Sequence, residues 1–224
     1  TYIPSPYLVV NAVTESMLNR VTFRDNKLRR AIGKEVIETY LYNIVRQLDT
    51  VTWISPELLY KKGKDKLLTS DVIAAEGDNV IFYDTKAITP SLKLRKFDVA
   101  EIEADIEIYA EDVIQIYNQI NNYLQGCFQL DKQYLKDKIF GIVVVLEDAV
   151  VSRKKVYEKV YEILEKTETL DTEEKNYICS HIKVLPLRAI ECMILQNTSL
   201  LPELIEQLSK PERWYAVSYT HLTL

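Results

Sequence analysis

Apolar residues recur at helical spacing in two long parts of the chain. Between residues 31 and 48 they fall three or four positions apart, which predicts an amphipathic helix with a broad buried face. The same spacing runs without a break from 98 to 125, and Gly126 follows it as a C-terminal cap. Further helices are predicted at 153–164, 188–196 and 201–209.

Between the first two helices the pattern changes to that of strands. The segments 57–62, 67–75 and 79–87 are rich in β-branched and aromatic residues. Turn sequences around Gly63 and Gly77 separate them. The three segments are therefore expected to form an antiparallel meander.

The run of apolar residues from 138 to 146 is continuous, as in a central strand that is buried on both faces. Residues 182–187 predict an edge strand. The resulting order, with an αβββαβ core, predicts a three-layer mixed α/β fold. The expected organisation is an N-terminal extension at 1–30, a core at 31–150, and a C-terminal α/β part of the same domain at 151–216.

Residues 217–224 are set apart from the fold. The string from Val217 to Leu224 matches a translated transposase sequencing adapter, an artefact found at the ends of metagenomic contigs. The chain also lacks a starting Met. We expect the gene to be truncated near Ala216, with a further C-terminal segment missing.

Composition fits a soluble globular protein of the cytoplasm. Hydrophobic residues make up 47% of the chain and charged residues 27%, and no apolar run is long enough to cross a bilayer. The 3 cysteines are scattered without a CxxC pair, which disfavours a zinc site. With only 5 glycines and no GxSxG or HExxH motif, the sequence also disfavours phosphate-loop, serine-hydrolase and zinc-protease chemistry.

The candidate chemistry lies in the predicted meander. Asp71 opens one apolar run, and the next run ends in Asp84-Thr85-Lys86. Because positions i and i+2 of a strand share a face, Asp84 and Lys86 should point together, with Thr85 facing away. Two carboxylates can hold a divalent metal, and the main-chain carbonyl of Thr85 can complete its shell. A nearby lysine can orient water or stabilise charge on a phosphate.

This layout resembles the PD-(D/E)xK nuclease superfamily, in which an acid on one strand precedes an acid-x-Lys on the next. Ser70 stands where the family has Pro. The resemblance implies a restriction-endonuclease-like core, a Mg²⁺ or Mn²⁺ cofactor and DNA as substrate. It implies that Asp71 and Asp84 bind metal and that Lys86 positions the attacking water.

Two further elements extend the resemblance. The family often carries a helix glutamate after a glycine, and the apolar frame that follows Gly33 matches Glu38 best, with Glu35 as the runner-up. Glu38 would then hold a second metal or a metal-bound water. Gln119 and Tyr123 fit the Q-x-x-x-Y element of RecB-like members and would support the site, with Gln115 on the same helix face.

Charge adds a local feature to an acidic chain. The formal net charge is -5 and the pI is about 5.3, so the whole chain does not have the basic character common among nucleic-acid binders. Basic residues nevertheless cluster at 61–66 and 93–96, on either side of the candidate site. They can form a basic rim around it.

Two alternatives remain open beside a DNA nuclease. One is a non-catalytic module on the same fold that binds nucleic acid or a protein partner in a defence or repair system. The other is a structural fold in which Asp84 and Lys86 form an ordinary surface ion pair.

Overall fold

The computed structural model describes residues 26–87, 98–146, 151–166 and 170–195. Outside these ranges lie residues 1–25 of the predicted N-terminal extension, the basic cluster at 93–96, the predicted helix at 201–209 and the adapter-like segment at 217–224. No helix in the described ranges combines the length and apolar character that crossing a membrane requires.

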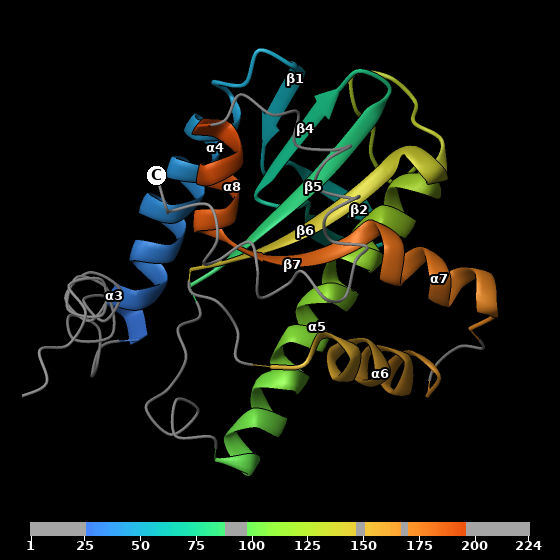
Figure 1. Ribbon diagram of the computed structural model, residues 1–224. Helices are drawn as coiled ribbons and strands as arrows, with labels where there is room; N and C mark the ends of the chain where they lie inside the picture. The colour runs from blue at the N-terminus through green and yellow to red at the C-terminus, as the bar shows by residue number, and fades with distance from the viewer. Residues whose placement is uncertain (1–25, 88–97, 147–150, 167–169, 196–224) are drawn as a thin grey trace, which may run out of the picture.

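The centre of the molecule is a five-stranded mixed sheet in the order β1-β4-β5-β6-β7 (Figure 1). β1, β4 and β5 are antiparallel neighbours, while β5, β6 and β7 run parallel. The strands are β1 Val51–Pro56, β4 Val72–Glu76, β5 Asn79–Lys86, β6 Ile139–Val145 and β7 Ile182–Pro186. The predicted α/β class is confirmed, as are the buried central strand and the edge strand that follows it.

Helices cover both faces of this sheet. Residues alternate along β5, so that Val80 and Phe82 join the core under α5, while Ile81 and Tyr83 join the core under α4. The helices on the first face are α5 Val99–Leu124, α6 Arg153–Leu164 and α7 Thr172–His181. Those on the second are the consecutive segments α3 Asn26–Ala31, η1 Ile32–Glu38 and α4 Thr39–Val45, with α8 Leu187–Leu195. A 3-10 turn, η3, spans Lys136–Lys138.

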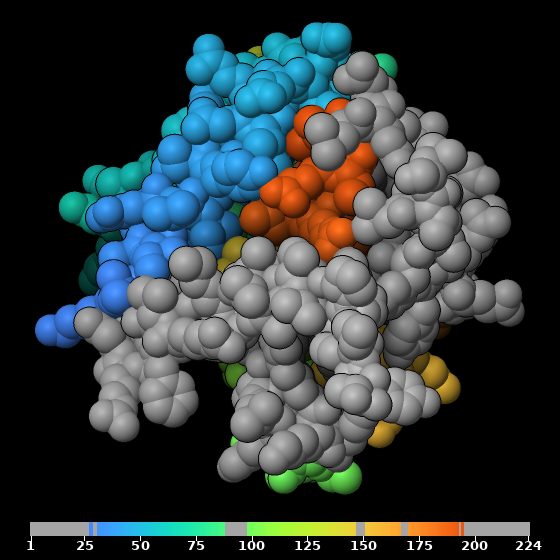
Figure 2. Space-filling view, turned by 60° about the vertical axis from the view of Figure 1, so that its left-hand side comes forward, coloured from blue at the N-terminus to red at the C-terminus, as the bar shows by residue number. Residues whose placement is uncertain are grey.

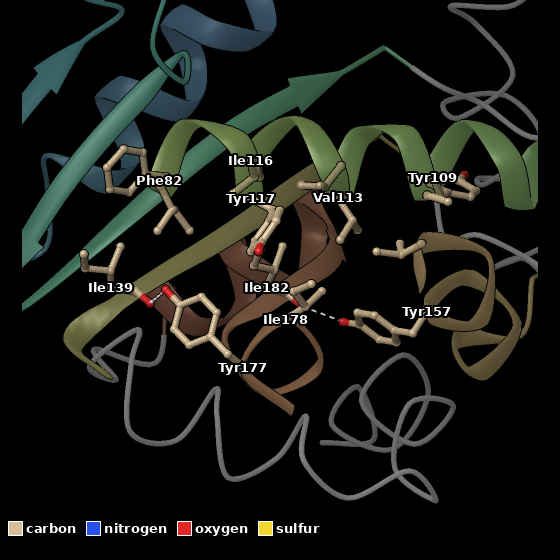
Figure 3. Packing of buried hydrophobic residues seen from close by; sticks show 14 of the residues in the cluster. Phe82, Tyr109, Val113, Ile116, Tyr117, Ile139, Tyr157, Tyr177, Ile178 and Ile182 are labelled. Atoms are coloured by element: carbon tan, nitrogen blue, oxygen red, sulfur yellow. Dashed lines mark hydrogen bonds between the residues drawn. The ribbon is translucent and has the colours of Figure 1, made fainter. Parts of the chain in front are cut away.

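The long helix α5 lies across the sheet, and its apolar side forms the larger core (Figure 3). The Asp98 carboxylate caps its first turn by accepting from the backbone N–H groups of Ala100 and Glu101. Its end is a Schellman motif, in which Gly126 adopts a φ of 76°. Both the predicted helix and its predicted cap are therefore confirmed.

On the opposite face, α8 lies against the helical segment that contains α4 (Figure 2). The Tyr40 hydroxyl donates to Glu191 Oε1 at 2.6 Å across this contact. Residues far apart in the sequence are thereby joined beside the sheet.

The predicted meander is wrong in its first strand. The partner of β4 is β1, a strand that the sequence did not predict because it ends in Pro56, a residue that usually interrupts a strand. Proline is tolerated there because it stands at the end of the strand. Segment 57–62 contributes instead to a separate hairpin of β2 Leu59–Lys62 and β3 Asp65–Leu68.

The segment 67–75, predicted as one strand, is divided between β3 and β4. The backbone N–H of Thr69 donates to Leu58 O at 2.9 Å and closes the base of the hairpin, so the chain leaves β3 before β4 begins. α7 was not predicted, and its short apolar stripe explains why.

The first helix is longer than predicted and irregular. It begins at Asn26, and Ile32–Glu38 forms a seven-residue π-helix within it. π-helical segments are rare and are often found at functional sites.

Candidate active site

Asp71 lies immediately before β4, and its carboxylate binds the end of β5. Asp71 Oδ2 accepts hydrogen bonds from the Thr85 backbone N–H at 2.6 Å and from the Thr85 hydroxyl at 2.7 Å. The register of the two strands places Val72 opposite Tyr83, so Asp71 comes next to Asp84. The structure therefore brings the first acid beside the acid-x-Lys segment. The Thr85 side chain, which was predicted to face away from the site, instead contacts Asp71 because the Asp71 carboxylate reaches the other face of the strand.

Asp84 and Lys86 point the same way, as predicted from strand geometry. Lys86 Nζ lies 2.8 Å from Asp84 Oδ2 and 3.4 Å from Asp112 Oδ1 of α5. It also donates to Gln115 Oε1 at 2.9 Å. The lysine is thus held between two carboxylates and an amide.

Glu38 approaches this group from the helix. At Gly33 the helix comes so close to the end of β5 that an added Cβ would lie 3.3 Å from the Cβ of Ala87. The π-helix then carries Glu38 to a half-buried position within electrostatic range of Asp71 and Asp84. Glu35, one turn back, is exposed.

The carboxyl groups repel one another in a partly desolvated place. Burial, and next the charge of Asp71, raise the pKa of Glu38 to about 7, against the opposing charge of Lys34. Burial also raises the pKa of Asp84 to about 6, although the Lys86 ammonium counteracts it. Bringing a cation to this site would relieve the repulsion.

Lys86 is the positive charge of the cluster. Burial alone would lower its pKa, but the carboxylates of Asp84 and Asp112 outweigh burial and raise the pKa above its ordinary value. Burial raises the pKa of Asp112, with Lys86 opposing the shift. The Lys86 side chain therefore stays protonated at neutral pH.

The two predicted supporting residues lie in different surroundings. Gln119 accepts a hydrogen bond from the buried Ser70 hydroxyl, and so fixes the residue before Asp71 against α5. The Tyr123 hydroxyl accepts from the backbone N–H of Tyr134 at 2.9 Å and donates to Lys132 O at 3.2 Å. Gln119 thus contacts the residue next to Asp71, whereas Tyr123 anchors the loop that follows α5.

The donor set fits a divalent metal in charge and in kind. Asp84 Oδ2 is buried and, apart from its ion pair with Lys86, has no hydrogen-bond partner in the described part of the chain. Over the same residues, no three Asp, Glu, His or Cys side chains are placed to bind one ion jointly. Mg²⁺ commonly takes one or two protein carboxylates and completes its shell with water and phosphate, so Asp71 and Asp84 suffice in kind.

Sequence reasoning did not find Asp112 or Glu57. Asp112, Gln115 and Gln119 follow one another at i, i+3 and i+7, so they form a polar line along one side of α5. This spacing is the feature of the sequence from which Asp112 could have been predicted as a neighbour of the site. Glu57 adds to the negative charge around Glu38, and it forms an ion pair with Lys34 at 3.7 Å.

Comparison with known proteins gives one partial similarity. The chain is 27% identical over 134 residues to a protein of Gelasinospora sp. (strain G114) named "Probable DNA-directed RNA polymerase". The match covers 60% of this chain and 15% of that protein, so the chain spans a small part of its relative. No family model matches the chain. No solved structure matches it either.

Proposed function

We propose that the chain is a Mg²⁺-dependent nuclease that hydrolyses phosphodiester bonds of DNA, with a restriction-endonuclease-like core of the PD-(D/E)xK type. The observation that carries the proposal is that the Asp71 carboxylate binds Thr85, the residue between Asp84 and its ion-pair partner Lys86, where β4 begins and β5 ends. Glu38 joins them from a helix, in the order that the family uses. DNA hydrolysis in the cytoplasm is the expected setting.

Each residue has a distinct role in this proposal. Asp71 and Asp84, with the main-chain carbonyl of Thr85, would hold the ion, and Glu38 would hold a second ion or its water. Bound Mg²⁺ or Mn²⁺ supplies charge neutralisation at the phosphate and a more acidic water.

Lys86 acts as a donor in this site. Since its ammonium stays protonated at neutral pH, it can orient the attacking water and stabilise the negative charge that develops on the phosphate. Asp112 and Gln115 position Lys86 through direct contacts.

The test is cleavage of plasmid and single-stranded DNA by Asp84→Asn and Lys86→Ala in Mg²⁺ or Mn²⁺. Each substitution removes a group proposed to act in the transition state, so we expect the rate to fall by at least about a hundredfold. Matched controls are Lys154→Ala and Glu158→Ala, an exposed ion pair on α6, which should leave the rate unchanged. Cleavage at the wild-type rate by either site variant contradicts the assignment.

One observation favours the alternative, a non-catalytic nucleic-acid- or protein-binding module of a defence or repair system. Asp71 and Asp84 already have partners in the protein, Thr85 and Lys86 respectively. Such internal pairing suits a site that is stable without an ion. A binding module of this kind would hold DNA without any metal-dependent cleavage.

A further inference from the structure

The hairpin of β2 and β3 stands outside the main sheet and starts from the candidate site. Its base is closed by hydrogen bonds of 2.9 Å between Leu58 N and Thr69 Oγ1, and of 2.9 Å between Thr69 N and Leu58 O. Glu57 immediately precedes this base, and Asp71 comes two residues after it. The base of the hairpin is therefore adjacent to the candidate site along the chain.

The inner face of the hairpin is fixed to the body of the protein. The Tyr60 hydroxyl accepts from Asn122 Nδ2 at 2.8 Å, and its ring lies 4.8 Å from that of Phe128. Lys62 Nζ donates to Asn122 Oδ1 at 2.7 Å. These contacts hold the inner face of the hairpin, which we call the arm, against α5 and the loop after it.

The outer face carries a pair of opposed lysines and a pair of exposed leucines. Lys61 stands directly opposite Lys66, and Leu59 opposite Leu68, so all four side chains share one face. Like charges placed opposite each other destabilise a hairpin. The two leucines are exposed, at 66% and 46%. This face combines positive charge with apolar surface and lies open to solvent.

The charge of the arm contrasts with that of the chain. Residues 59–68 hold four lysines and one aspartate, a formal net charge of +3, in a chain of formal net charge -5. Lys64 and Gly63, with a φ of 63°, form the turn at the tip. A polyanion would neutralise the opposed lysines.

We propose that this hairpin is the arm with which the chain binds duplex DNA beside the candidate site. A two-stranded ribbon fits a DNA groove, in which Lys61 and Lys66 reach phosphates and Leu59 and Leu68 contact sugar and base edges. The inference rests on the proposed function for the identity of the substrate, but it concerns binding and needs no cleavage.

The experiment measures the affinity of the full chain for a fluorescent DNA duplex without divalent metal, by anisotropy over a range of salt. Lys61→Ala with Lys66→Ala should reduce the magnitude of the slope of log affinity against log salt by about 1.8, which corresponds to roughly 60-fold weaker binding near 0.1 M salt. Lys154→Ala with Lys155→Ala removes two exposed positive charges of α6 and should change neither quantity. An unchanged slope in the hairpin variant overturns the proposal and leaves the face to a protein partner.

A second variant separates the apolar contact from the charge. Leu59→Ser with Leu68→Ser should weaken duplex binding several-fold at an unchanged salt slope, because the leucines release no counterions. Circular dichroism and thermal unfolding verify that each variant is folded. Wild-type protein that binds single strands but not duplexes overturns the proposal.

These outcomes are separate from those of the nuclease proposal. If duplex binding depends on the lysine pair but no metal-dependent cleavage occurs, the result supports the proposed DNA-binding arm and contradicts the proposed nuclease activity. If cleavage depends on metal but the wild type and the lysine variant bind the duplex equally well, the result supports the nuclease activity and contradicts the role of the arm in DNA binding.

Discussion

At the scale of single residues, Lys86 organises the candidate site. It lies between Asp84 and Asp112, whose charges outweigh the effect of burial and keep the pKa of the lysine above its ordinary value. Asp71 is fixed separately, through two hydrogen bonds from Thr85. The site therefore consists of a lysine-centred group and an adjoining acid held by the neighbouring strand.

Asp112→Asn tests the positioning of Lys86. Losing one of its two carboxylates should free the ammonium, lower the pKa of Lys86 and reduce DNA cleavage by about 10–100-fold. The measurement is the rate of cleavage as a function of pH, with Asp105→Asn two turns earlier on α5 as the control. An Asp112→Asn rate and pH profile equal to those of the control would show that Asp112 has no such role.

Glu38→Gln tests the burial of Glu38 beside the other acids. The folded pKa of Glu38 is raised from 4.5 to about 7, so between these values the folded state binds more protons than the unfolded state. The free energy of unfolding is therefore highest, as far as Glu38 is concerned, below about pH 4.5, and it falls as the pH rises towards 7. Relative to wild type, Glu38→Gln should gain stability from pH 4.5 to pH 8 in urea unfolding.

The control for that comparison is Glu35→Gln, because Glu35 is exposed one turn earlier on the same helix. It should follow wild type across the pH range. A Glu38→Gln protein that also follows wild type would show that Glu38 is neither buried nor close to the other acids.

At the scale of elements, the sequence identified those with a long or uniform pattern. The helix α5, its Gly126 cap and the buried strand β6 were predictable because their periodicity or apolar run continues over many residues. β1 was missed, since its terminal Pro56 resembled a break. The hairpin was misassigned because pairing partners depend on tertiary contacts that local patterns do not contain.

Gly141→Ala tests how α5 is seated on β6. A Cβ at this position would overlap Ile116 Cγ2 in the packed core, so we expect destabilisation by about 1–3 kcal/mol. The measurement is the free energy of unfolding in urea. In an Ile116→Ala background, where the overlapping methyl group is absent, Gly141→Ala should lower the free energy of unfolding by less than it does in the wild-type chain. Wild-type stability of Gly141→Ala would contradict the close approach.

At the scale of the whole molecule, a mixed sheet with helices on both faces gathers the candidate site at one end of β4 and β5. The sequence predicted Asp71, Asp84, Lys86 and Glu38 from a linear motif. Asp112 escaped prediction because only folding brings α5 over Lys86. The arm formed by β2 and β3 escaped for a similar reason, since the register that opposes Lys61 and Lys66 belongs to the folded hairpin.

The most direct test of the central claim is a time course of supercoiled plasmid incubated with the wild-type chain. Parallel reactions contain Mg²⁺, Mn²⁺ or excess EDTA, and Asp84→Asn serves as the protein control. The account predicts nicked or linear DNA in Mg²⁺ or Mn²⁺, and intact plasmid with EDTA or with Asp84→Asn. Cleavage that persists in EDTA or in Asp84→Asn, or intact plasmid in both metals, would contradict it.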